Sequence, residues 1–112
     1  MIRFEFLEEN KEKLKKKYYS CKPFPHLVLK DICDKSKINE LYSSIPELEN
    51  KSRDYMFANN KFEKSNYQTL GPLFKELQED LRSEKMNSFL SFLTNKETFV
   101  DPKNHGGGLH QG

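Results

Sequence analysis

Apolar residues recur at helical spacing in two adjoining stripes in the second half of the chain. The first stripe follows Gly71-Pro72, and proline suits a first helical position because its missing N–H would have no partner there. The second stripe follows Ser83, whose hydroxyl can cap the free N–H groups of a first turn. We therefore predict helices over residues 72–82 and 84–94. Their inward positions are Leu70, Leu73, Phe74, Leu77, Leu81, Met86, Phe89, Leu90 and Leu93.

Two weaker helical stripes lie in the first half of the chain. A narrow stripe predicts a surface helix over residues 8–19. A second stripe, after a capping Asp34 or Ser36, predicts a helix over residues 35–45. The inward positions are Leu7, Leu14 and Tyr18 in the first helix, and Ile38, Leu41, Tyr42 and Ile45 in the second.

Short extended segments separate these helices. The most apolar of them, residues 26–32, follows Pro23-Phe24-Pro25, where proline restricts the backbone and stops a helix. A largely buried strand is predicted there. Shorter strands are predicted over residues 55–58 and 107–111, and the weak alternation over residues 1–6 is compatible with a short edge strand. Four helices packed on a few short strands predict an α+β fold.

The composition limits the chain to one domain with a thin core. Of its 112 residues, 35% are hydrophobic and 32% are charged, whereas typical globular chains are about 45–50% apolar, with Gly included, and about 25% charged. Nine Phe and five Tyr supply more aromatic area than disordered chains carry. No run approaches the roughly 18 apolar residues of a membrane span. The first residues lack the apolar core of a secretory signal.

The positive charge is concentrated at the start of the chain. Residues 1–23 carry seven basic and four acidic side chains, and the whole chain carries +2. The chain has three Arg, so the lysines from Lys11 to Lys22 are interpreted as a solvated helix face rather than a nucleic-acid surface. Cys21 and Cys33 form no CxxC pair, so free thiols in a reducing compartment are expected, and a cytoplasmic location is predicted.

The segment from His105 to His110 contains three consecutive glycines, which are costly to order. A phosphate-binding loop is disfavoured because neither GK[ST] nor a helix follows. A metal site formed by both histidines with Asp101 matches no standard spacing. A close backbone approach or a bulge entering a sheet is favoured. Just before this segment, Phe99-Val100 is expected to be buried.

Other candidate chemistry in the chain has simple structural interpretations. His26 is expected to bond a neighbouring carbonyl, and Cys33 is expected to be a buried thiol with no supporting base. The chain contains no HExxH, GxSxG or His-x-Asp sequence. The residues themselves therefore indicate no catalytic constellation.

The order of several motifs resembles a known enzyme family. The run Pro23-Phe24-Pro25-His26-Leu27-Val28-Leu29-Lys30-Asp31 precedes a predicted helix, and the later motifs are Ser83-Glu84-Lys85-Met86-Asn87-Ser88-Phe89-Leu90-Ser91-Phe92-Leu93-Thr94, Asp101-Pro102 and Gly106-Gly107-Gly108-Leu109-His110. This order is similar to the N-terminal portion of 2-oxoglutarate/Fe(II)-dependent oxygenases of the prolyl-4-hydroxylase-like group. The resemblance implies one incomplete domain. Residues 1–22 would be a helical extension, 23–104 a helical support region with the first strands, and 105–112 the start of a double-stranded β-helix, or jelly roll.

The resemblance also implies a function for a longer parent protein. Relatives hold Fe(II) with a His-x-Asp pair and a distant His, bind 2-oxoglutarate through a basic residue, and hydroxylate a C–H bond of a prolyl or similar substrate, in a protein or a small molecule. The His-x-Asp pair is expected beyond Gly112, so this chain would supply no catalytic or metal-binding residue. His110 and Gln111 would at most border the cofactor pocket. The 112 residues alone are expected to be inactive and to bind neither Fe(II) nor 2-oxoglutarate.

A complete small helical interaction module is the alternative hypothesis. Its basic first helix and its two Leu/Phe-striped helices could form an apolar groove. Under the oxygenase hypothesis, the same stripes would lack the sheet that covers them. Apolar side chains then expected to be partly uncovered are Leu73, Leu77, Phe89 and Leu93.

Overall fold

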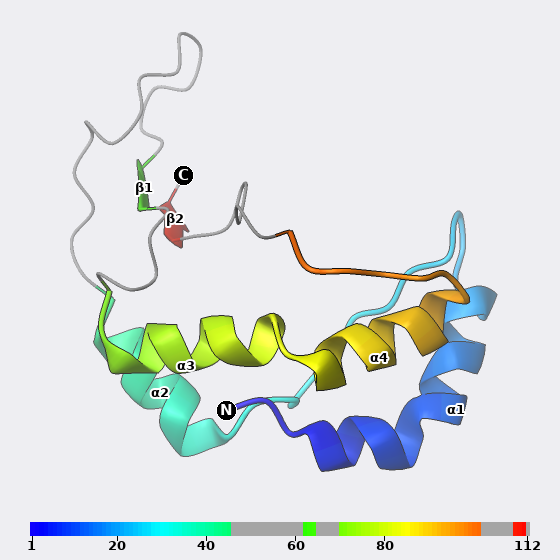
Figure 1. Cartoon of the computed structure of the whole chain (residues 1–112), viewed down its shortest axis with the longest axis horizontal. Helices are drawn as coiled ribbons and strands as arrows, with labels where there is room; N and C mark the ends of the chain where they lie inside the picture. The colour runs from blue at the N-terminus through cyan, green and yellow to red at the C-terminus, as the bar shows by residue number, and fades with distance from the viewer. Residues whose placement is uncertain (46–61, 65–69, 102–108, 112) are drawn as a thin grey trace, which may run out of the picture.

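The computed structural model describes residues 1–45, 62–64, 70–101 and 109–111, with backbone alone at 62–64 and 109–111. This part of the chain is mostly helical rather than an even α+β mixture. Its helices are α1 (Phe4–Ser20), α2 (Lys35–Ser43), α3 (Pro72–Leu81) and α4 (Glu84–Thr94). Figure 1 shows α3 and α4 following one another, with α2 against α3 and α1 against α4. None of the described helices is long and apolar enough to cross a bilayer.

All four predicted helices are present, close to their predicted ends, because their signals are local. Asp34 Oδ1 accepts hydrogen bonds from the backbone N–H groups of Ser36 and Lys37, at 3.0 and 3.2 Å. Ser83 Oγ accepts one from the Met86 N–H at 3.2 Å, so both capping predictions are confirmed. Pro72 occupies the first turn of α3. The start of α1 differs from the prediction, since the helix begins at Phe4.

The larger apolar cluster lies between α1 and α4. Leu7 is its most buried residue, with 1% of its surface exposed. Ile2 joins it from the start of the chain, and Leu14, Tyr18, Leu27, Leu29 and Ile32 pack against it. Its members on α4 are Met86, Phe89 and Leu93. The expectation that Phe89 and Leu93 are partly uncovered is therefore wrong, because α1 covers them.

A smaller cluster lies between α2 and α3. Leu41, Leu70 and Phe74 are buried there. Met1, Ile38, Leu73 and Leu77 pack against them. Leu73 and Leu77 remain half-buried, as expected. Adjacent residues 1 and 2 thus contribute to different clusters, so the start of the chain connects the two.

Several predicted inward positions face solvent instead. Tyr42 is 76% exposed, and Ile45 is 41% exposed. The reason is that α2 contacts α3 through the side carrying Ile38 and Leu41, and the described part of the chain covers no other side of α2. Leu81 and Leu90, at the edges of their stripes, are also exposed.

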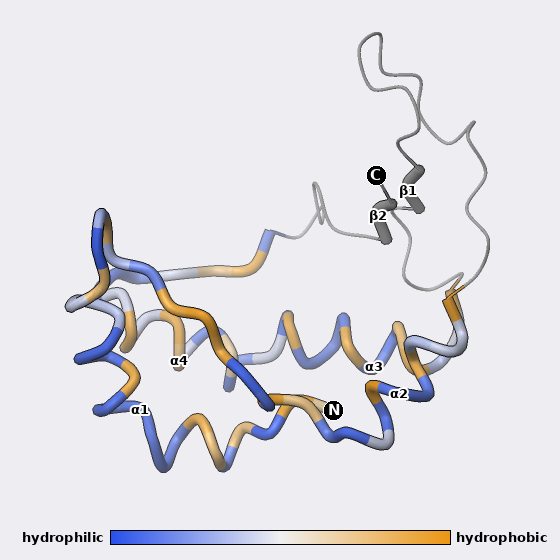
Figure 2. Tube along the Cα trace, turned by 180° about the vertical axis from the view of Figure 1, so that it is seen from behind, coloured by the Kyte–Doolittle hydropathy of each residue, from blue (hydrophilic) through white to orange (hydrophobic). Residues whose placement is uncertain are grey.

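The predicted buried strand over residues 26–32 does not form within the described part of the chain. The segment connects α1 to α2, crossing behind α4 in Figure 1 and in front of it in Figure 2. Among the residues that the structure describes, the ladder contact nearest to it is an isolated antiparallel bridge between Ile2 and Cys33, just beyond its end. Val28 is 68% exposed, so the segment is half-buried rather than buried. A strand needs a neighbouring strand to pair with. The first residues of the chain could be that neighbour, but within the described residues they form only one bridge, because the chain turns into α1 at Phe4.

After α4 the chain leaves the helix through Asn95, which has a left-handed φ of 57°. The Thr98 hydroxyl lies 2.7 Å from Ser91 Oγ and donates to the Asn87 carbonyl oxygen at 3.1 Å, which ties the following segment to α4. Phe99 is 86% exposed, so its predicted burial is wrong. Thr98 anchors this segment through polar bonds, and the neighbouring Phe99 side chain stays exposed to solvent.

A short antiparallel ladder joins β1 (Phe62–Lys64) to β2 (Leu109–Gln111). The strand β2 lies within the predicted 107–111 segment. The predicted strand at 55–58 falls outside the described residues.

Candidate functional site

The residues predicted to border a cofactor pocket, His110 and Gln111, lie on β2. His110 is opposite Glu63, and Gln111 is opposite Phe62. The structure describes the backbone alone at these positions, and His105 lies outside the described residues. Asp101, the third residue of the weighed metal site, is exposed. The structure therefore brings no predicted site side chains together among the residues it describes.

His26 has the structural role expected from the sequence. Its ring Nδ1 lies 2.8 Å from the Phe24 carbonyl oxygen, and the two rings meet edge to face with their centroids 5.3 Å apart. In the part of the chain that the structure describes, no three His, Cys, Asp or Glu side chains gather closely enough to hold a metal ion.

Cys21 and Cys33 are free thiols. Burial raises the pKa of the Cys33 thiol above its ordinary value of 9.0, the Met1 ammonium opposes that rise, and Asp80 adds to it. A raised pKa keeps the sulfur protonated at neutral pH, and the thiolate is the reactive form. Cys33 is thus unsuited to act as a nucleophile.

A charged cluster at the start of the chain was not predicted. The Met1 ammonium lies 3.0 Å from Glu76 Oε1 and 2.9 Å from Asp80 Oδ2. Asp80 Oδ2 also accepts the Ile2 backbone N–H at 2.9 Å. Lys37 Nζ donates to Glu76 Oε1 at 2.6 Å. The cluster therefore joins the first residues to both α2 and α3.

These contacts shift the pKa values of the groups involved. Burial alone would lower the pKa of the Met1 ammonium, but hydrogen bonds to Asp80 and Glu76 outweigh it and raise that pKa above 8.0. The hydrogen bond from Lys37, followed by that from Met1, lowers the pKa of Glu76 below 4.5. Both groups are held in their charged forms, which suits a structural clamp and not proton transfer. The sequence does place two acidic residues, Glu76 and Asp80, four positions apart on one predicted helix. It does not show that their partners are Met1 and Lys37, which lie far away in the chain.

A groove of about 410 Å³ lies between the first halves of α1 and α4. Phe4, Leu7 and Phe89 supply its apolar lining, and Lys85 Nζ lies 5.9 Å from the centre of the Phe4 ring. The remaining lining residues are Glu5, Glu8, Glu84 and Ser88. No histidine lines the groove to activate the Ser88 hydroxyl. The groove can receive an apolar group but has no acyl-transfer machinery.

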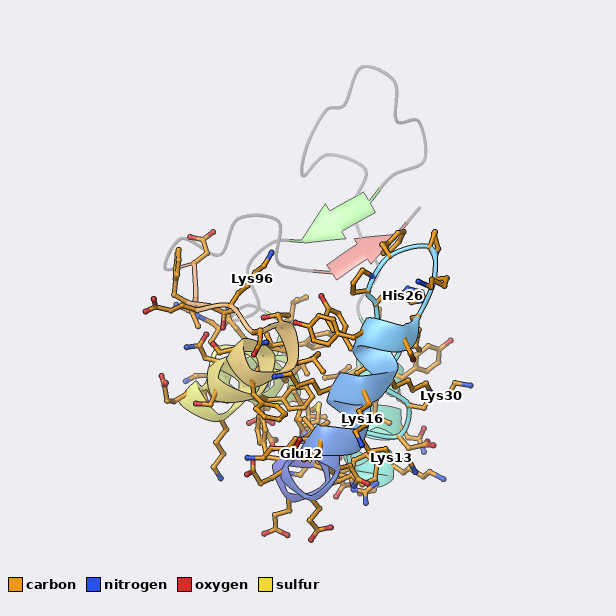
Figure 3. All side chains as sticks on the ribbon, turned by 90° about the vertical axis from the view of Figure 1, so that its right-hand side faces the viewer. Glu12, Lys13, Lys16, His26, Lys30 and Lys96 are labelled. Carbon is orange, nitrogen blue, oxygen red and sulfur yellow. The ribbon has the colours of Figure 1, made fainter. Side chains whose placement is uncertain are left out.

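The lysines of α1 divide into two sets. Lys11 and Lys15 turn towards α4, with their Nζ atoms 5.1 and 4.5 Å from the centre of the Phe92 ring. Lys13 and Lys16 are exposed and point outward, as does Lys30 (Figure 3). The basic run therefore serves partly as packing, which a charge count alone does not indicate.

Comparisons of this chain with models of protein families, with curated proteins and with solved structures give no match.

Proposed function

We propose that this chain is the N-terminal support region of a 2-oxoglutarate- and Fe(II)-dependent dioxygenase of the prolyl-4-hydroxylase-like group. The observation that carries the proposal is the order of its motifs. The Pro-Phe-Pro-His run precedes α2, the motif ending in Phe-Leu-Thr lies on α4, and the Gly-Gly-Gly-Leu-His motif ends on β2. In the parent protein, the substrate would be a prolyl residue or a similar C–H donor.

The packing of the helices is compatible with a scaffolding role, although α1 covers Phe89 and Leu93, which the oxygenase hypothesis expected to be partly uncovered. Leu7, Phe89 and Leu93 form a core that needs no catalytic sheet to cover it. The α4 motif supplies both buried side chains and, through Asn87 and Ser91, the hydrogen bonds that hold the next segment against the helix. Such a helical layer can position a sheet without contributing reactive groups.

Fe(II) and 2-oxoglutarate belong to the proposed parent, and the described side chains of this chain do not fit them. The described residues offer no metal-binding group, and the His26 ring is bonded to the Phe24 carbonyl oxygen. We therefore assign no chemical step to these residues. Positioning of the sheet is the role that the proposal gives them.

The decisive experiment determines the coding sequence downstream of Gly112. The proposal expects a strand-rich continuation with a His-x-Asp pair a short distance away. The longer protein, loaded with Fe(II), should convert 2-oxoglutarate to succinate, and alanine at the histidine of that pair should abolish the conversion. The 112-residue chain serves as the control and should show no turnover. A stop codon directly after Gly112, or a continuation without such a pair, would contradict the proposal.

A second candidate function is a helical interaction module, which the groove between α1 and α4 favours. Its apolar lining from Phe4, Leu7 and Phe89 could accept an apolar side chain of a partner. A downstream stop codon would favour this candidate. Succinate formation by the longer protein would favour the oxygenase.

A further inference from the structure

The segment Leu27–Lys30 runs without a bend between α1 and α2 but belongs to no sheet within the described part of the chain (Figure 2). The backbone N–H and C=O groups of these four residues form no hydrogen bond there. Buried backbone N–H and C=O groups normally find partners, whereas those at the surface can bond water or another chain. A row of unpaired groups at the surface is a template for another strand.

Side chains along this segment alternate as they do in a strand. Leu27 and Leu29 pack against the larger apolar cluster, whereas Val28 is 68% exposed and Lys30 is exposed. The two leucines hold the backbone against the core and direct a β-branched side chain outward. The segment is thus an ordered edge, which reduces the entropy that pairing would cost.

Both ends of this edge are defined. Pro25 has no N–H to donate, which limits a ladder on the N-terminal side. Asp31 has a left-handed φ of 57°, which interrupts the extended run on the other side. A ladder therefore spans residues 26–30, and its central residue is Val28.

We propose that a second copy of this chain pairs with this edge, antiparallel, about a two-fold axis at Val28. In this register Val28 faces its own copy, Leu27 faces Leu29, and His26 faces Lys30. Like charges directly opposite each other destabilise a strand pair, and this register places no two acidic side chains and no two Lys or Arg side chains opposite each other. A two-fold contact is closed and self-complementary, so it gives a dimer rather than a fibre. This inference does not depend on the proposed function.

The test measures the mass of the protein by sedimentation equilibrium at neutral pH. The wild-type chain should show a monomer–dimer equilibrium. Val28→Asp and Val28→Lys each place two like charges on the axis, so each should weaken dimerisation by about tenfold or more. An equimolar mixture of the two variants should restore the dimer, because Asp then faces Lys. Phe99→Asp, at another exposed apolar residue, should leave dimerisation unchanged.

Other results would overturn the proposal. These are a wild-type chain that stays monomeric at about 1 mM, a Val28→Asp variant that dimerises like the wild type, or a mixture that does not restore the dimer. Amide hydrogen exchange of the wild type gives an independent measurement that needs no variant. Alternate N–H groups point to the partner in an antiparallel pair, so exchange at one alternate set, either Val28 and Lys30 or Leu27 and Leu29, should slow as the concentration rises through the dimerisation range. Concentration-independent exchange at all four residues contradicts the pairing.

Discussion

At the scale of single residues, the Met1 ammonium should link stability to alkaline pH. Its pKa is raised above 8.0, so the folded state holds this proton more tightly than the unfolded state. The stabilisation is complete below pH 8.0 and is lost as the pH rises through the folded pKa. Urea titrations should therefore give a free energy of unfolding that falls as the pH is raised above 8.0. Equal stability throughout that range would contradict this role.

Glu76 should produce the opposite dependence in acid. Its pKa is lowered below 4.5, so its stabilisation is present above that pH and is lost as the pH falls through the folded pKa. Glu76→Gln removes the charge that Met1 and Lys37 share. At neutral pH this change should cost about 1 kcal/mol and reduce both pH dependences. Glu79→Gln, on an exposed position of the same helix, is the matched control. It should change neither the free energy of unfolding at neutral pH nor its dependence on pH.

The Leu7 side chain should matter more than any surface charge. It is 1% exposed and lies at the centre of the α1–α4 contact. Leu7→Ala removes buried methyl groups and leaves a cavity, which should cost about 2–5 kcal/mol in urea unfolding. Leu90→Ala, at a position 37% exposed on α4, should cost much less. Similar losses for the two variants would show that α1 does not cover α4 as described.

At the scale of elements, Ser83 should stabilise the junction between α3 and α4 as a cap. Its hydroxyl donates to the Asp80 carbonyl oxygen at 2.7 Å and accepts from the Met86 N–H at 3.2 Å. Ser83→Ala leaves both groups without this partner and should cost about 1 kcal/mol. Ser88→Ala, on an exposed position within α4, should have little effect or stabilise slightly, because alanine favours helices. Circular dichroism during urea titration measures both changes.

The helices could be predicted from sequence because their signals lie within each element. Apolar spacing and the residues Asp34, Ser83 and Pro72 defined three of the four starts. Which apolar residues become buried depends on neighbouring elements. The narrow stripe of α1 indicated a surface helix, yet Leu7 is the most buried residue. Tyr42 had the correct spacing for burial, but no described element lies on its side of α2.

The charged cluster and the segment 26–32 show a second limit of sequence reasoning. Met1 and Glu76 are 75 positions apart, so no local pattern connects them. The apolar segment has the composition of a strand, but a strand forms when a neighbour pairs with it. The order of the motifs, in contrast, is visible in the sequence without knowledge of any tertiary contact, and the proposed function rests on it. His110 and Gln111 remain predictions from that resemblance.

At the scale of the whole molecule, the two apolar clusters should open as separate units. The α1–α4 cluster contains Leu7 and Phe89, and the α2–α3 cluster contains Leu41 and Phe74. The described connections between them are the first residues of the chain with their ion pairs to α3, the segment that leads from α1 to α2, and the short link around Ser83. Units with few shared apolar contacts can unfold below the free energy of global unfolding.

Native-state hydrogen exchange with a pair of matched variants tests this separation. Phe74→Ala should speed amide exchange in α2 and α3 more than in α1 and α4, because Phe74 is buried in the smaller cluster. Phe89→Ala should give the reverse pattern, since its ring packs between α1 and α4. Each change removes a buried ring and should cost about 3–5 kcal/mol within its own unit. Equal acceleration in all four helices, for both variants, would show that the molecule unfolds as one unit and that residues 1–3 join the clusters too firmly for either to open alone.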